Sequence, residues 1–410
     1  MGERAETTFD LLLGTEIRAA RIEGLLRADP VVAAQWRAEA AIAEAVASIG
    51  LDDVQLSEAD LLVRIAESRA QGADAPAVED ALAVLRFLRA PGDPLGDPVG
   101  VLSRIARLAR RDTDADETPA PAEELVDVFA GVRGRAPVLE ALRAAADYAW
   151  RTGRLSPVAE RMVFVAAEGA ARCAGPGRAR GSRADDPLRG LGGRIDADWI
   201  ALPSLALTRG RFRSWSPGNA RGARDIVEGI AVVLDQEIGR VIAIRSWQEA
   251  VKRAGEGRHG RSRLLDAGRA FGLEPVMTAA ILASRLGMTP RGATNVLVEL
   301  EGRGLVQEIT MRRAARIWAT PGLAAKLAGA RTTGTRARAR LDGEKPPVAL
   351  GEGEAPAGGL RQRHLKEETE ASVQRALAEF DRSLAEVDEI LARPVARREQ
   401  GEILAHRTRT

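Results

Sequence analysis

Helical spacing of apolar residues along the first 170 residues is the feature that most limits how this chain can fold. Apolar side chains recur three and four residues apart from Phe9 to about Ala174, and few segments show the two-residue alternation of a strand. Asp29-Pro30 ends the first helix, Gly50 ends the second, and Ser156-Pro157 opens the last one as an N-cap followed by proline. We therefore expect a mainly α protein in which residues 9–174 form a helical domain. Further helices are expected from Ser57 and at residues 76–90, 98–110, 121–131 and 137–152.

The composition agrees with a helical core. Apolar residues make up 45% of the chain but aromatic residues only 3%, so the core must be built from Ala, Leu, Val and Ile. These small and aliphatic side chains favour close helix packing. A chain of 410 residues has room for about two or three domains.

The second half of the chain divides into segments of different character. Residues 175–198 have the composition of a flexible loop, residues 199–258 of connecting helices, and residues 331–360 of a disordered linker. Within the connecting part, Ala220–Gly255 has the pattern of one long amphipathic helix, straight or kinked at a glycine.

The segment 361–393 carries an apolar heptad pattern. Its seam has spacings of 4, 3, 4, 3 and 4 and consists of Val373, Leu377, Phe380, Leu384, Val387 and Leu391. This pattern predicts a coiled-coil-like helix, although a helix that packs on its own domain has the same pattern. We favour self-association, which would make the protein a homodimer.

Residues 259–320 have the signals of a winged helix-turn-helix. A helix at about 260–271 is ended by Pro275, Thr278 can cap the next helix over 279–286, and Gly287 can supply the left-handed residue of a sharp turn. Thr289-Pro290 then starts a second helix whose buried stripe is Ala293, Val296, Leu297 and Leu300. The segments LVQEI and ARIWA after it predict two short strands joined by a basic tip.

The exposed face of the second helix carries side chains suited to reading DNA bases. Arg can make two hydrogen bonds to guanine, and Asn can do the same with adenine. We expect contacts to double-stranded DNA from the helix and from the basic wing. The predicted DNA-binding residues are Thr289, Arg291, Thr294, Asn295, Arg312, Arg313 and Arg316, and Val298 lies on the same face.

The charge distribution favours this interpretation. Residues 1–150 hold 16 Arg against 27 Asp and Glu, whereas residues 205–345 hold 25 Lys and Arg against 13 Asp and Glu. A basic half can bind phosphates while an acidic half stays away from them. Two alternatives remain open. The charged residues could serve only to keep two helical surfaces hydrated, or the winged helix could bind another protein instead of DNA.

Parts of the chain resemble known families. The segments AIAEAVASIGLDDVQLSEADLL, IALPSLALTRGRF and SRLLDAGRAFGLEPVMTAAILASRLGMTPRGATNVLVEL, in this order, resemble an uncharacterised alphaproteobacterial family. That resemblance implies a helical domain of unknown function followed by a C-terminal helix-turn-helix, and hence a DNA-binding transcriptional regulator.

The front half also distantly resembles Fic-type nucleotidyl transferases. That family needs a His-Pro-Phe motif followed by a Gly-Asn-Gly-Arg turn, and the segment RSWSPGNARGAR resembles only the turn, through Gly218, Asn219, Arg221 and Arg224. Arg213 stands where the catalytic base would be, and a guanidinium cannot accept a proton at neutral pH. The alternative to a regulator is therefore a catalytically inactive Fic-like scaffold or protein-interaction adaptor.

No residue pattern predicts catalysis, a cofactor or a metal. The chain has one cysteine, Cys173, and three histidines far apart in sequence, His259, His364 and His406. We expect no enzyme activity, no cofactor and no metal site. A single cysteine, the absence of a signal peptide and the absence of a long apolar run predict a cytoplasmic protein without a membrane span.

Overall fold

The computed structural model describes residues 7–67, 75–109, 120–153, 156–174, 198–209, 215–256, 262–310 and 316–327. The predicted linker 331–360, the heptad helix 361–393 and the loop 175–197 lie outside these residues. Two wing residues, Arg312 and Arg313, lie outside them as well.

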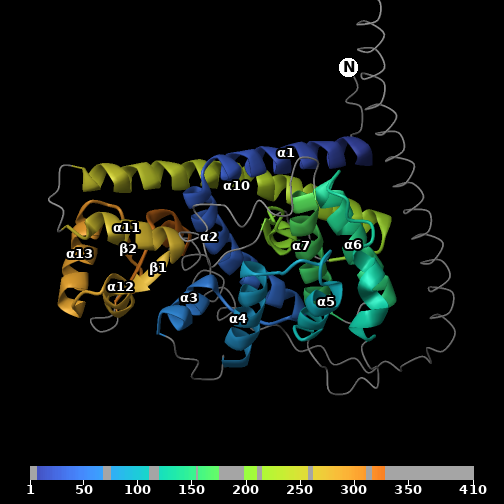
Figure 1. The fold of residues 1–410 in the computed structure, drawn as a ribbon, viewed down its shortest axis with the longest axis horizontal. Helices are drawn as coiled ribbons and strands as arrows, with labels where there is room; N and C mark the ends of the chain where they lie inside the picture. Colours follow the sequence, from blue (N-terminus) through green and yellow to red (C-terminus); the bar gives the residue numbers. More distant parts are fainter. Residues whose placement is uncertain are drawn as a thin grey trace, which may run out of the picture.

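The described part is mainly helical, as the apolar spacing predicts (Figure 1). Thr7 caps the first helix in a capping box with Asp10, and Asp29 caps the second ahead of Pro30. The helices before the winged module are α1 (Thr8–Ala28), α2 (Pro30–Ile49), α3 (Glu58–Glu67), α4 (Ala75–Arg89), α5 (Pro98–Ala106), α6 (Pro137–Arg151), α7 (Pro157–Ala174), α9 (Pro203–Arg209) and α10 (Ala220–Gly255), with 3-10 segments η1 (Gly50–Asp52) and η2 (Ala122–Phe129).

One expected helix differs in kind. The segment predicted as a helix over 121–131 is the 3-10 helix η2, which begins after Pro121 and ends before Gly131. Its eight residues bury Leu125, Val128 and Phe129, as the apolar pattern predicts. The tighter turn is typical of short connecting segments.

The 36-residue helix α10 is the longest element of the described part, and α1 lies along it (Figure 1). The two helices run in the same direction, because Arg224 near the start of α10 reaches Thr8 while Asp235 further along pairs with Arg18. The far end of α10 carries the winged module (Figure 1). This helix therefore fixes the position of that module relative to the helical domain.

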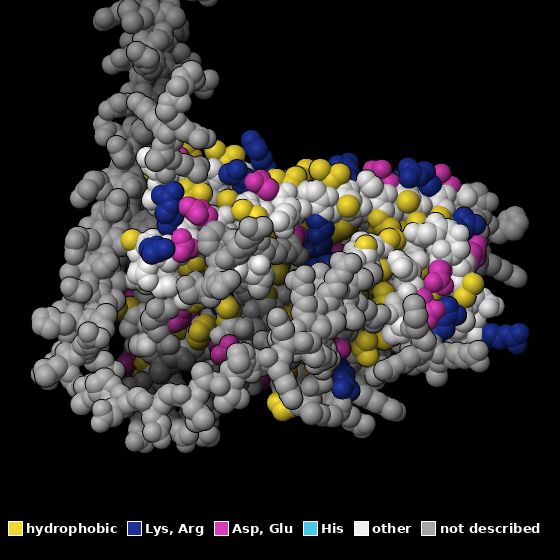
Figure 2. Space-filling view, turned by 180° about the vertical axis from the view of Figure 1, so that it is seen from behind, with side chains coloured by type: hydrophobic (Ala, Val, Ile, Leu, Met, Phe, Trp, Pro, Cys, Tyr) yellow, Lys and Arg dark blue, Asp and Glu magenta, His cyan; other side chains and the backbone are white. Residues whose placement is uncertain are grey.

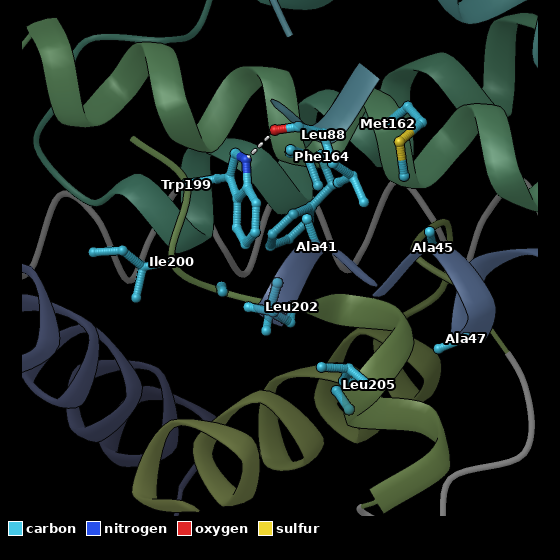
Figure 3. Packing of buried hydrophobic residues seen from close by; sticks show 14 of the residues in the cluster. Ala41, Ala45, Ala47, Leu88, Met162, Phe164, Trp199, Ile200, Leu202 and Leu205 are labelled. Atoms are coloured by element: carbon cyan, nitrogen blue, oxygen red, sulfur yellow. Dashed lines mark hydrogen bonds between the residues drawn. The ribbon is translucent and has the colours of Figure 1, made fainter. Parts of the chain in front are cut away.

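The core of the helical domain forms around α2, α7 and the segment 199–207. Trp199 is fully buried, donates its indole N–H to the Leu88 carbonyl at 2.6 Å, and has its ring centroid 5.8 Å from that of Trp36 (Figure 3). Short side chains such as Ala41 and Ala45 let helices approach these rings closely. An aromatic-poor chain thus places Trp36 and Trp199 at the centre of an alanine-rich core.

A small antiparallel sheet joins this core to the winged module. Its order is β1 (Val276–Thr278), β3 (Ile317–Ala319) and β2 (Gln307–Glu308), with Met277 opposite Trp318. Val276, Ile317 and Ala319 belong to the large hydrophobic cluster of the helical domain, whereas Met277 and Trp318 belong to the cluster inside the winged module. Strands β1 and β3 are therefore covered on both faces, whereas β2 at the edge exposes Gln307.

Candidate nucleic-acid interface

The winged module begins with three helices and a strand. After α11 (Leu264–Leu273), β1 leads directly into α12 (Ala279–Leu286), and α13 (Pro290–Gly302) follows three residues later. Strands β2 and β3 then form a hairpin. The order helix, strand, helix, helix, hairpin is that of a winged helix-turn-helix.

Local chemistry at the turn explains why the chain bends here. Thr278 Oγ1 accepts a hydrogen bond from the Ile281 N–H and caps α12, and Gly287 ends that helix with φ +61°. Thr289 Oγ1 then accepts from the Gly292 N–H at 3.1 Å, with Pro290 in the first position of α13. A left-handed glycine and a Thr-Pro start fix a sharp turn between the two helices.

One face of α13 is buried in the module and the opposite face is exposed. Ala293, Leu297 and Leu300 are fully buried beside Leu282 of α12 and Phe271 of α11. Arg291, Asn295 and Val298 are exposed, and the side chain of Val298 remains 47% accessible. The exposed residues are those that the sequence predicts for this face, whereas Val296, expected in the buried stripe, is only half-buried.

The structure gives the predicted contact residues different roles. Within the described part of the chain, Arg291 and Asn295 make no side-chain hydrogen bond or ion pair. Thr289 is engaged in capping, and Thr294 Oγ1 donates to the Pro290 carbonyl at 3.0 Å. The side chains available to a ligand are therefore Arg291 and Asn295, with the two threonines shaping the start of the helix.

Arg316 is held inside the wing. Its guanidinium pairs with Glu308 across the hairpin, lies 3.6 Å from Glu301 of α13, and stacks 4.8 Å from the centroid of the Trp318 ring. The bond to Glu308 raises the pKa of Arg316 above its usual value. A phosphate would have to compete with two carboxylates for this side chain, so Arg316 mainly braces the wing against α13.

Acidic groups on α13 lie in its second half and are paired with arginine. Glu299 accepts from Arg303 at 3.2 Å. Glu301 accepts from the Glu308 N–H and from the Trp318 indole, besides its contact with Arg316. The first half of the helix, from Thr289 to Val298, has Arg291 as its single charged residue. The first half of α13 therefore carries a net positive charge.

The long helix α10 anchors this module. Trp247 donates its indole N–H to the Leu305 carbonyl at 2.7 Å, and Val251 packs in the module's cluster. Gly268 of α11 has no room for a Cβ atom because the Val251 side chain fills that space. The close approach of α10 and α11 thus depends on glycine at this position.

Two functional features of the module were not expected from the sequence. Strand β1 has three residues, too short for alternation to reveal it, and only Pro275 and Thr278 mark its ends. The second is Glu301, which connects α13 with both wing strands. Its role depends on residues 7 and 17 positions later, and no local pattern signals that.

The remaining sequence candidates are positioned as follows. Asn219, in the segment that resembles a Fic-type turn, caps α10 by accepting from the Gly222 N–H at 2.7 Å, while Arg213 lies outside the described residues. The described side chains include no group of three or more His, Cys, Asp or Glu that could hold a metal ion. Among the described helices, none combines the length and apolar character that a bilayer crossing requires.

In comparisons with known proteins, no family model matches this sequence and no curated protein matches it.

Proposed function

We propose that this protein binds double-stranded DNA through its winged helix-turn-helix and acts as a transcriptional regulator. Helix α13 would lie in a major groove, with the wing beside the adjacent backbone. The exposed face of α13 supports this most strongly, since it presents Arg291 and Asn295 without partners from the described residues and without an acidic neighbour in the first two turns.

The electrostatics of α13 support the same placement. The N-terminal end of a helix carries a partial positive charge and unsatisfied N–H groups, which suit a phosphate. Arg291 adds a full charge at this end. The carboxylates of Glu299 and Glu301 lie further along; Glu299 pairs with Arg303, and Glu301 shares Arg316 with Glu308. DNA approaching the start of α13 would thus meet little repulsion.

A regulator of this kind would work in the cytoplasm, as a homodimer on two half-sites. Dimeric helix-turn-helix proteins place their recognition helices about 34 Å apart, one turn of DNA. The cytoplasmic location and the homodimeric state both belong to the function that we propose.

Binding of the purified full-length protein to fluorescent genomic fragments tests the proposal. We expect affinity to fall steeply between about 50 and 200 mM salt, because phosphate contacts release counterions. Arg291→Ala should weaken binding by about 10- to 100-fold, the range for loss of a bidentate base contact. Arg86→Ala serves as control, since Arg86 is an exposed arginine of α4 that pairs with Glu79.

Two outcomes would contradict the proposal. One is affinity that does not change with salt, or no binding to any fragment pool. The other is equal loss of binding in the Arg291→Ala and Arg86→Ala proteins, which would indicate only a general effect of charge.

A further inference from the structure

The outer face of α1 is exposed and apolar. Leu13 and Ile17 are 46% and 45% accessible and lie one turn apart on the same face of α1. Hydrophobic side chains gather along this edge of the molecule, where α1 lies (Figure 2). Val232 of α10 is 42% accessible and lies about one turn before the Arg18–Asp235 ion pair that joins the two helices.

The exposed residues of α1 follow a regular seam. Every residue of this seam is exposed, and the spacings of 3, 4, 3, 4 and 3 are those of a helix that packs along another helix. We name it the α1 seam; it consists of Asp10, Leu13, Ile17, Ala20, Gly24 and Arg27.

The α1 seam is complementary to itself when a second copy runs in the opposite direction. In that register Leu13 lies opposite Gly24, Ile17 opposite Ala20, and Asp10 opposite Arg27. Each large side chain meets a small one, and each charge meets its opposite. A two-fold axis repeats every contact, as an interface between identical subunits requires.

Gly24 gives an independent argument. It lies inside a helix, where glycine costs roughly 1 kcal/mol relative to alanine. A Cβ atom at this position would meet no described atom within 4 Å, so the described part of the single chain does not need glycine there. Close approach of another surface would account for a glycine on this exposed face.

The charged residues at the two ends of the α1 seam also favour a second copy of this chain as the partner. Arg27 Nε donates to Glu23 at 2.8 Å, and a guanidinium has four further N–H donors. Asp10 accepts from Thr7 through Oδ2 only, which leaves Oδ1 for a second donor. Both groups can therefore make an additional bond across an interface.

We propose that the α1 seam is a homodimer interface at which two copies of this chain pack their α1 helices antiparallel. A helix of 21 residues is about 30 Å long. A standard interface that buries about 800 Å² per partner has a diameter of roughly the same length. Val232 extends the apolar surface beyond the seam. This interface does not involve the heptad segment 361–393, and it does not depend on DNA binding.

Sedimentation equilibrium of the full-length protein without DNA tests the seam. The wild type is expected to be a dimer at micromolar concentration. Gly24→Gln should raise the dimer dissociation constant at least about 10-fold, because the long glutamine side chain would occupy the space into which Leu13 of the other copy packs. Thermal unfolding of the monomer should not suffer, since glutamine is a better helix former than glycine.

A matched control is Gly302→Gln. Gly302 is also an exposed helical glycine whose Cβ would meet nothing within 4 Å, but it lies at the end of α13. It should leave the dissociation constant unchanged. Ile17→Glu should dissociate the dimer as Gly24→Gln does.

Charge reversal distinguishes this register from any other use of α1. Asp10→Arg and Arg27→Asp should each be monomeric alone, because like charges then face each other at both ends of the seam. An equimolar mixture of the two variants should form a heterodimer, since every facing pair is again of opposite sign.

A monomeric wild type overturns the proposal. So does a dimer that survives both Gly24→Gln and Ile17→Glu but dissociates in Leu384→Glu, which would assign self-association to the heptad segment. Failure of the charge-reversed mixture to associate would exclude the antiparallel register. None of these outcomes bears on whether Arg291 contacts DNA.

Discussion

Glu39 and Thr320 are joined by a hydrogen bond of 3.2 Å although they lie 281 positions apart in the chain. The same carboxylate accepts from Gln35 at 3.0 Å and from Arg240 of α10 at 2.8 Å. Arg240 also reaches Glu237, which accepts the indole N–H of Trp36 at 2.8 Å. This buried network connects α2, α10 and the end of the last wing strand.

Removal of Glu39 should therefore destabilise the junction between the helical domain and the winged module. Glu39→Ala removes one of the two carboxylates that pair with Arg240. Breaking a buried ion pair costs about 3 to 5 kcal/mol of folding stability. Denaturant unfolding measures the change. Glu249→Ala is the control, since Glu249 and Arg245 form an exposed pair that should contribute less than about 1 kcal/mol. Equal effects of the two substitutions would show that the network is not structural.

Glu16 predicts a pH dependence of stability. Burial raises the pKa of Glu16 from 4.5 to about 7. The protonated form is thus favoured by folding, so its contribution is fully present below about pH 4.5 and is lost as the pH rises through 7. A shift of this size corresponds to roughly 3 kcal/mol.

The geometry explains how a protonated Glu16 fits. Oε1 accepts from the N–H groups of Val138 and Leu139 at 2.9 and 3.0 Å, which leaves Oε2 to carry the proton. Glu16→Gln keeps the acceptor and removes the titration. We expect the wild type to lose more stability than Glu16→Gln between pH 5 and 7.5 in thermal unfolding. Parallel pH profiles of the two proteins would refute the assignment.

Two buried arginines on α7 should lose different amounts of stability when each is replaced by methionine. Arg172 makes ion pairs of 2.7 Å with Glu168 and 2.8 Å with Glu23. Arg161 donates to the Ser48 carbonyl at 3.3 Å and lies 4.9 Å from the centroid of the Trp215 ring, but among the described residues its Nε and second Nη have no hydrogen-bond partner. Burial lowers the pKa of Arg161 to about 10.

Arg172→Met should therefore lower the free energy of unfolding by about 3 to 5 kcal/mol, because it removes the guanidinium that pairs with the carboxylates of both Glu168 and Glu23. Arg161→Met removes the positive charge that attracts Glu44 and Glu160, but it also removes a guanidinium with two nitrogens that have no hydrogen-bond partner among the described residues, so we expect a smaller loss than for Arg172→Met. Unfolding free energies of both variants at one pH decide the matter. A large loss for Arg161→Met would mean that its attraction to Glu44 and Glu160 outweighs its missing hydrogen bonds.

The proposed DNA contact predicts base-specific effects at two neighbouring positions. Asn295→Ala should reduce discrimination for adenine at one position by about 1 to 3 kcal/mol, and Val298→Ala should reduce preference for thymine by a smaller amount through loss of methyl contact. Selection of bound sequences from a random pool compares each variant with the wild type. Unchanged sequence preferences in both variants would exclude this face of α13 as the reading surface.

Sequence reasoning predicted the helical elements well because their signals are local. The Thr-Pro start of α13, the glycine at position 287 and the uninterrupted pattern of α10 each lie within a few turns of the structure they determine. The exposed face of α13 followed from the same periodicity. A helix wheel needs no knowledge of the rest of the chain.

The parts that the sequence did not predict depend on contacts between distant residues. Strand β1 exists because β3, 41 positions later at Met277 and Trp318, provides its hydrogen bonds. Arg316 looked like a free basic residue of the wing, and only its pairing with Glu308 and Glu301 shows otherwise. Charge composition describes how many basic groups exist, but folding decides which of them remain available.

Strands β1 and β3 lie between the two hydrophobic clusters, and side chains on both of their faces are buried. Slippage of β3 by one residue would exchange Trp318 with its neighbours and insert an indole into the cluster that now receives Ile317 and Ala319. Both clusters would be mispacked at once. A strand of three residues, which on its own would pair in several registers, is thereby restricted to a single one, and the orientation of the winged module on the helical domain is fixed with it.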